Sequence, residues 1–160
     1  MLLKPTIVLN SVLEITTELL DKNNIKGLIL DLDNTLTTHG NPRPADGVLD
    51  WIAKMKASGV SLIIVSNNKH DRVRPFAELL GLEFISNGKK PLSVGFNKAQ
   101  IKMNMPYDNI AIVGDQLFTD MLGANLRRVK TIFVFPFEAE KGILFGIKRM
   151  IERPFLPKRG

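Results

Sequence analysis

The stretch LILDLDNTLTTHG, residues 28–40, decides the fold because it joins an apolar run to a pair of carboxylates. Its first three residues are apolar without alternation, which is typical of a strand covered on both faces. Asp31 and Asp33 follow, and side chains two residues apart on an extended chain point to the same side. Repulsion between them would raise the pKa of one unless a cation intervenes. The stretch therefore predicts a buried strand that ends at a charged site.

Four more short apolar runs follow the first strand, and helical patterns separate them. The five predicted strands are GLILD (27–31), SLIIVS (61–66), EFIS (83–86), IAIVGD (110–115) and TIFVF (131–135). The intervening apolar stripes are Val48, Ile52 and Met55; Val73, Phe76, Ala77 and Leu80, closed by Gly81; and Leu92, Phe96, Ala99 and Met103. This alternation predicts an α/β fold of three layers, Rossmann-like, with a central parallel sheet between helices.

Ligands of such sheets lie outside the carboxyl ends of the strands. Asp31, Ser66 and Asp115 each end a predicted strand, so we expect them to converge at one edge. A hard cation is the simplest partner for the acidic pair, and Mg²⁺ prefers carboxylates, water and phosphate oxygens. The segment GDQLFTD, with Asp115 and Asp120, can complete such a site.

The composition of the 160 residues is that of an ordinary globular protein, with 44% hydrophobic and 24% charged residues. We expect one domain over residues 1–160. The absence of cysteine excludes disulfides, thiol nucleophiles and cysteine-bound zinc. The sequence shows neither a signal peptide nor an apolar run long enough to span a bilayer, so we expect a cytoplasmic protein.

The two ends of the chain carry distinct patterns. Residues 1–24 have apolar positions at roughly helical spacing, which predicts a packed N-terminal helical segment, with membrane-surface contact as the alternative. The net charge of +6 comes from residues 126–160, which hold nine Lys or Arg and three Glu. Residues 138–160 are expected to form a basic C-terminal helix and tail, either packed with solvated charges or in contact with an anionic partner.

Four motifs in order, DLDNT, VSNN, GKKP and GDQLFTD, resemble those of the haloacid dehalogenase-like (HAD-like) phosphohydrolase superfamily. Longer segments are similar to the YqeG family of bacterial phosphatases, subclass IIIA of the superfamily: NIKGLILDLDNTL, SNGKKPLSVGF, IAIVGDQLFTDMLGANL and IKRMIERPFLP. That family is in turn similar to mitochondrial phosphatidylglycerophosphatases. The resemblance covers nearly the whole chain.

The resemblance implies a role for each motif residue, beginning with the acidic pair. Asp31 would be the nucleophile that forms an aspartyl-phosphate, and Asp33 would be the general acid and base. A lysine of GKKP would offset the phosphoryl charge. The family pattern places this lysine directly before the proline, which favours Lys90 over Lys89.

The remaining motif residues would bind phosphate or metal. Ser66, the backbone N–H of Asn67, and Thr35 would contact the phosphoryl group. Asp115 would ligate Mg²⁺ together with Asp31 and the backbone carbonyl of Asp33, and Asp120 would pair with Lys90 or a metal-bound water. For Asp120, an interaction with a helix N-terminus is the alternative.

The spacing of the motifs limits the substrate. A cap domain of about 50 residues does not fit between Asp33 and Ser66 or between Ser66 and Lys90, so the site should be capless and open. The resemblance implies phosphatidylglycerophosphate, a lipid monoester, with peripheral contact to anionic membrane through the basic C-terminus. A phosphatase of nucleotides, sugar phosphates or phosphoproteins is the alternative. Nucleic-acid binding is a further alternative, against which the scarcity of aromatic stacking platforms argues.

Overall fold

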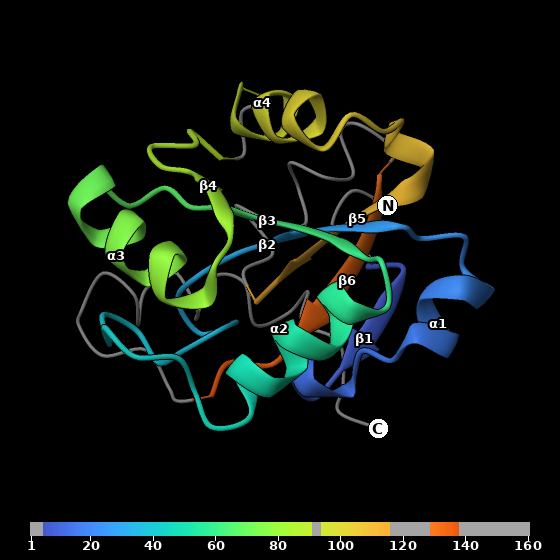
Figure 1. Ribbon diagram of the computed structural model, residues 1–160, viewed down its shortest axis with the longest axis horizontal. Helices are drawn as coiled ribbons and strands as arrows, with labels where there is room; N and C mark the ends of the chain where they lie inside the picture. The colour runs from blue at the N-terminus through green and yellow to red at the C-terminus, as the bar shows by residue number, and fades with distance from the viewer. Residues whose placement is uncertain (1–4, 91–93, 116–128, 138–160) are drawn as a thin grey trace.

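The computed structural model describes residues 5–90, 94–115 and 129–137 (Figure 1). These residues form a sheet of six parallel strands in the order β1-β6-β5-β2-β3-β4. All five predicted strands are present: β2 (Gly27–Leu30), β3 (Ser61–Val65), β4 (Glu83–Ile85), β5 (Ile110–Gly114) and β6 (Lys130–Val134). The predicted parallel α/β architecture is therefore confirmed.

The acidic stretch lies at the centre of the sheet, because β2 pairs with β5 on one side and β3 on the other. Leu30, its last residue, is in register with Val113 of β5 and Ile64 of β3. The three strands therefore end side by side, and every residue of β2 is buried. This register brings the residues that follow the strands to one edge.

The sixth strand, β1 (Ile7–Leu9), lies where the sequence predicted a helical segment, and that prediction was wrong for these residues. Ile7 pairs with Ile132 and Leu9 with Val134, so the segment extends the sheet beyond β6. Helical structure follows only in two short pieces, η1 (Val12–Glu14) and α1 (Thr17–Lys22).

Two capping side chains explain why one continuous helix does not form near the N-terminus. The Ser11 hydroxyl accepts from the Leu13 N–H at 3.1 Å, and the Thr16 hydroxyl accepts from the Leu19 N–H at 3.1 Å. Each cap starts a new helical piece with its own direction. Of the apolar positions in this segment, Val12 and Leu20 are buried, whereas Leu13 is 40% exposed. The spacing therefore does not mark one buried face of a continuous helix.

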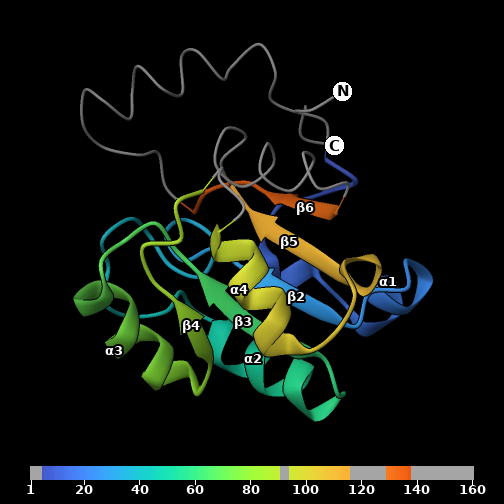
Figure 2. The same cartoon turned by 90° about the horizontal axis from the view of Figure 1, so that it is seen from above.

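Helices cover both faces of the sheet, as Figures 1 and 2 show. Helices α2 (Val48–Ala57) and α3 (His70–Leu80) pack with η1 and α1 in one core, and α4 (Val94–Met103) packs on the opposite face in a second core. Alternate residues of β2 separate the cores, since Leu28 and Leu30 face the first and Ile29 the second. A short turn, η2 (Tyr107–Asn109), precedes β5.

The helix limits follow local sequence signals. Helix α3 ends at Leu80 because Gly81 adopts a left-handed conformation with φ of 67°, as its position after the apolar stripe predicted. The indole N–H of Trp51 in α2 donates to the carbonyl of Ile15 at 3.0 Å, which ties the N-terminal segment to the domain.

The segments between the motifs contain no additional domain, as predicted. Residues 34–65 form a loop, α2 and β3, and residues 67–89 form α3, β4 and short connections. Within the described ranges, no helix is long and apolar enough to cross a membrane. The predicted basic C-terminal helix and tail, residues 138–160, lie outside the described residues.

Candidate active site

Asp31 follows β2 directly and forms an ion pair with Lys90. The Asp31 N–H donates to the carbonyl of Val113 at 3.0 Å, which continues the β2–β5 pairing by one residue. Lys90 Nζ donates to Asp31 Oδ1 at 2.8 Å, and the two side chains are only 3% and 12% exposed. Such burial strengthens the attraction between the charges. Lys89 is instead exposed and has a φ of 54°.

The side chain of Asn67 fixes the segment that carries Lys90. Its Oδ1 accepts from the Lys90 N–H at 2.7 Å, and its Nδ2 donates to the Lys90 carbonyl at 3.2 Å. This pairing satisfies both backbone groups of Lys90 and fixes the direction in which its side chain leaves the chain. The sequence interpretation used only the backbone N–H of Asn67, so this function of its side chain was missed.

Two glycines let the Lys90 segment approach β3 and α4 closely. The Gly88 N–H donates to the carbonyl of Ser66 at 2.8 Å, and the Gly88 carbonyl accepts from the Gly95 N–H at 3.0 Å. A Cβ at Gly95 would lie 2.5 Å from the Gly88 oxygen, which a real side chain could not occupy. The small residues therefore hold three elements together around Lys90.

Asp33 reaches the edge of the sheet through a tight turn. Asn34 adopts a left-handed φ of 62°, a conformation that asparagine tolerates better than most residues. The turn closes when the Leu36 N–H donates to the carbonyl of Leu32 at 2.9 Å. This turn explains why asparagine follows the acidic pair.

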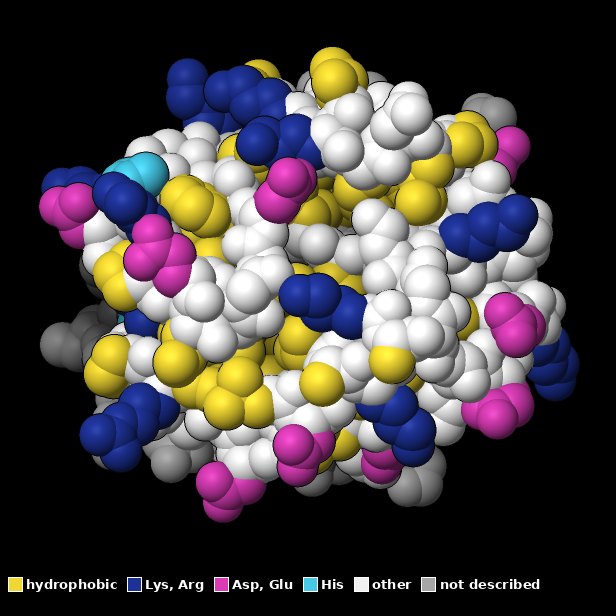
Figure 3. Space-filling model, viewed as in Figure 1, with side chains coloured by type: hydrophobic (Ala, Val, Ile, Leu, Met, Phe, Trp, Pro, Cys, Tyr) yellow, Lys and Arg dark blue, Asp and Glu magenta, His cyan; other side chains and the backbone are white. Residues whose placement is uncertain are grey.

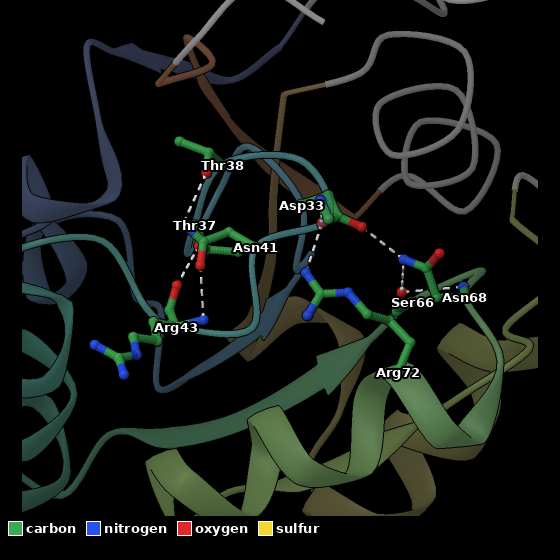
Figure 4. A network of polar contacts seen from close by, with 9 residues as sticks. Asp33, Thr37, Thr38, Asn41, Arg43, Ser66, Asn68 and Arg72 are labelled. Atoms are coloured by element: carbon green, nitrogen blue, oxygen red, sulfur yellow. Dashed lines mark hydrogen bonds and ion pairs between the residues drawn. The ribbon is translucent and has the colours of Figure 1, made fainter. Parts of the chain in front are cut away.

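The Asp33 carboxylate is held by three donors (Figure 4). Its Oδ1 accepts from Arg72 Nη2 at 2.8 Å and from the Gly40 N–H at 2.9 Å, and its Oδ2 accepts from Asn68 Nδ2 at 2.7 Å. Burial alone would raise the pKa of Asp33, but these hydrogen bonds and the charge of Arg72 outweigh it and lower the pKa. Asp33 is therefore a carboxylate at neutral pH.

Ser66 follows β3 and lies beside this network. Its hydroxyl accepts from the Asn68 N–H and from Asn68 Nδ2, both at 3.1 Å, so Asn68 links Ser66 to Asp33. Figure 4 shows these side chains directed toward one another from the ends of different elements. The predicted convergence of the two motifs is thus present.

Asp115 and Thr35 complete the buried polar groups near the strand ends. Asp115 follows β5, the neighbour of β2, and is fully buried. Thr35 is also fully buried, and its hydroxyl has no hydrogen-bond partner within the described part of the chain. A buried polar atom without a protein partner is available to a ligand. Asp120 lies outside the described residues.

The oxygen donors near Asp31 suit a hard cation. Asp31 and Asp115 supply carboxylates at the ends of neighbouring strands, and the chain between Asp31 and Asp33 adds backbone carbonyls. Over residues 5–90, 94–115 and 129–137, no group of three or more His, Cys, Asp or Glu side chains is placed to hold a metal ion. Among the described residues, a metal here would therefore have two carboxylates, those of Asp31 and Asp115, as side-chain ligands.

Sequence reasoning missed Asn68 and Arg72, although a signal for each was present. Asn68 is the last residue of the VSNN motif, and Arg72 lies in the first turn of α3. A helix that starts just after a strand end places its first turn near the ligand edge. The apolar stripe of α3 suggested a start nearer Val73, which hid the position of Arg72.

A cavity of about 530 Å³ lies beside Asp33. It is lined by two parts of the chain: Asp33, His39 and Gly40 from the loop after β2, and Asn67, Asn68, Lys69 and Arg72 from the β3–α3 connection and α3. Neither Asp31 nor Lys90 lines it. The cavity therefore adjoins the site next to Asp33 and not next to the Asp31–Lys90 ion pair.

Comparisons with known proteins address the family to which the chain belongs. The family model described as haloacid dehalogenase-like hydrolase matches residues 8–134. A Bacillus subtilis protein described as "Probable phosphatase YqeG" is 38% identical over 152 residues, covering 95% of this chain and 88% of that protein.

Solved structures with low sequence identity share the fold. The cobalt-bound deoxy-D-mannose-octulosonate 8-phosphate phosphatase of Haemophilus influenzae has a TM-score of 0.53 at 16% identity, covering 82% of this chain and 89% of that chain. The p-nitrophenyl phosphatase of Archaeoglobus fulgidus has a TM-score of 0.57 at 15% identity, covering 83% of this chain and 94% of that chain.

Proposed function

Because the chain belongs to the haloacid dehalogenase-like hydrolases, as a phosphatase of that family, we propose that it hydrolyses a phosphomonoester through an aspartyl-phosphate on Asp31. The observation that carries this proposal is the buried ion pair between Asp31 and Lys90 at the carboxyl end of β2. The pair places a positive charge beside the carboxylate that would attack phosphorus and close to where the phosphoryl oxygens would lie.

The first half of the reaction transfers the phosphoryl group. An oxygen of Asp31 forms a bond to phosphorus, the bond from phosphorus to the ester oxygen breaks, and Asp33 gives a proton to the departing oxygen. Asp33 is ionised in the substrate-free protein. In this mechanism it takes up one proton from solvent when the substrate binds, because nearby phosphoryl charge favours the protonated carboxyl, and it is this proton that passes to the departing oxygen.

The second half restores the enzyme. Asp33 takes a proton from a water molecule, the water oxygen attacks phosphorus, and the bond between phosphorus and Asp31 breaks to release inorganic phosphate. Ser66 and Thr35 are proposed to contact phosphoryl oxygens through their hydroxyls, since both are buried at this edge. The backbone N–H of Asn67 is proposed as a further donor, and Asp120 as a partner of Lys90 or of metal-bound water.

We propose that Asp31, Asp115 and the backbone carbonyl of Asp33 hold Mg²⁺, because hard oxygen ligands of this number suit that ion. When bound, the metal supplies positive charge that orients the phosphate and lowers the repulsion against the attacking carboxylate. The cobalt-bound state of the Haemophilus influenzae phosphatase, which shares the fold, supports the use of a divalent metal.

We propose phosphatidylglycerophosphate as the substrate, presented at the inner face of the membrane to a cytoplasmic enzyme. Support comes from the lack of an inserted domain over the described site, which leaves access for a bulky headgroup, and from the basic residues at 126–160. A nucleotide, sugar phosphate or phosphoprotein would undergo the same chemistry and is the competing substrate class.

The activity is tested by phosphate release from p-nitrophenyl phosphate, nucleotides and phosphatidylglycerophosphate in vesicles, with Mg²⁺ or excess EDTA. We expect release that needs the metal, is lost in Asp31→Asn, and is most efficient for the lipid. Release that persists in Asp31→Asn or in EDTA would refute the mechanism. Preference for a nucleotide would overturn only the substrate assignment.

Membrane contact needs a separate measurement. We expect the protein to float with vesicles that contain anionic lipid and to be recovered less with neutral vesicles, with the difference shrinking in high salt. Equal recovery from both vesicle types would rule out electrostatic attraction to the membrane.

A further inference from the structure

The position of the cavity beside Asp33 relates it to the leaving group of the substrate. Asp33 lines the cavity and, in the proposed mechanism, protonates the departing oxygen, whereas Asp31 and Lys90 do not line it. A leaving group bonded to that oxygen must extend away from Asp31, because attack and departure are roughly in line. The cavity therefore lies where the alcohol part of the substrate would be.

The charges around this cavity favour an anion. Asp33 contributes one negative charge, which Arg72 already balances at 2.8 Å. Lys69 contributes a second positive charge, is exposed, and forms no ion pair with any described residue. Asp71 is the acidic neighbour in sequence, but it does not line the cavity. The lining thus carries a positive charge that no described carboxylate offsets.

The donors at the cavity also suit phosphate-like oxygens. Arg72 uses only Nη2 for its hydrogen bond within the described part of the chain, which leaves its other guanidinium nitrogens for a ligand. The guanidinium lies 5.5 Å from the ring centre of Phe76, so its plane is supported from one side. A pre-positioned guanidinium loses little entropy when it binds an anion.

We propose that this cavity binds a second anionic group carried by the leaving alcohol, with Lys69 and Arg72 as its cationic contacts. The preferred substrate is then a phosphomonoester whose alcohol bears a second anionic group, over one with a neutral alcohol. This inference rests on the proposed phosphatase activity and narrows its substrate. Recognition of the headgroup is separate from attraction to a membrane, because the cavity is formed by the catalytic domain itself.

The test uses soluble substrates so that membrane binding has no effect. The full-length protein with Mg²⁺ is assayed on glycerophosphoglycerophosphate, which has the second anion, and on glycerol 3-phosphate, which does not. The measured quantity is the ratio of kcat/KM for the two compounds. We expect a ratio well above one that falls about three- to five-fold in Lys69→Gln and about ten-fold in Lys69→Glu. The fall should appear mainly in KM and shrink at high salt.

A matched variant and a third substrate sharpen the test. Lys54→Gln removes an exposed lysine of α2 that does not line the cavity, and its ratio should equal that of wild type. Fructose 1,6-bisphosphate carries a second phosphomonoester in place of the phosphodiester. A Lys69-dependent preference for it over glycerol 3-phosphate would also support a second-anion site, whereas a preference independent of Lys69 would contradict one.

Binding without turnover gives an independent readout. Glycerophosphoglycerol has the phosphodiester but no monoester. Its binding should slow the exchange of the Arg72 side-chain N–H protons with solvent, measured by nuclear magnetic resonance. It should bind more weakly to Lys69→Glu than to the wild-type protein. No binding, together with equal ratios in wild type and both Lys69 variants, would overturn this inference. If activity itself does not depend on Asp31, the proposed function fails instead, so the two failures are distinguishable.

Discussion

Lys90 Nζ lies 2.8 Å from Asp31 Oδ1, although the two residues are 59 positions apart in the chain. The lysine comes from the segment after β4, and the aspartate from the end of β2. Both side chains are nearly buried, so each compensates for the cost of burying the other's charge. The pair brings together the DLDNT and GKKP motifs, and the proposed mechanism needs a residue from each.

The choice between the two lysines of GKKP can be tested directly. Lys90→Met should lower kcat by about 100- to 1,000-fold, because it removes the charge beside the nucleophile. Lys89→Met should change kcat less than about three-fold, because Lys89 is exposed. Kinetics on p-nitrophenyl phosphate, with melting curves of both variants, provide the measurement. A larger loss in Lys89→Met would reverse the assignment.

Asn67 is expected to act as a positioning residue through its paired hydrogen bonds to Lys90. Asn67→Ala should lower kcat about ten-fold with a smaller change in KM, and lower the free energy of unfolding by about 1–2 kcal/mol. Asn23→Ala is the matched control, since it also removes an amide bonded to a backbone carbonyl, at the end of α1. If both variants lost the same fraction of kcat, the loss in Asn67→Ala would be due to lower stability and not to a displaced Lys90.

The ion pair between Asp33 and Arg72 should make stability depend on pH. The pKa of folded Asp33 is below its usual value of 3.8, so the pair stabilises the fold fully above that value and progressively less as the pH falls through the lower folded pKa. Arg72→Met should lower the free energy of unfolding by about 1–3 kcal/mol at pH 7. Urea unfolding at pH 7, 5 and 3 should show this difference narrowing only below about pH 4. A constant difference would exclude the titration of Asp33 as its cause.

Gly95 should be sensitive to a single added methyl group. Gly95→Ala would place Cβ 2.5 Å from the backbone oxygen of Gly88, so α4 must shift away from the Lys90 segment. We expect about 1–3 kcal/mol less stability and a lower kcat. Val94→Ala, at an exposed position of the same helix, should change neither by much. Wild-type behaviour of Gly95→Ala would show that this segment tolerates displacement.

Most strands of the sheet could be predicted from the sequence, because a strand buried on both faces consists of consecutive apolar residues. The residues of β2, β3 and β5 are apolar without alternation, and polar residues begin where each strand ends. The N-terminal segment was harder, since β1 lies at an edge with Val8 exposed and its neighbours half-buried. Edge strands carry weaker patterns, and the spacing around Leu9 matched a helix equally well.

The sequence by itself determined the parallel sheet and the motif residues that end its strands, because strand burial and motif order are local properties. Only the tertiary structure decided which lysine meets Asp31, that the Asn67 side chain fixes it, and that Arg72 and Asn68 hold Asp33. These contacts join segments more than twenty residues apart, and their geometry depends on strand register, on the left-handed turn at Asn34 and on the start of α3. No local pattern encodes such distances, since they result from packing the whole domain.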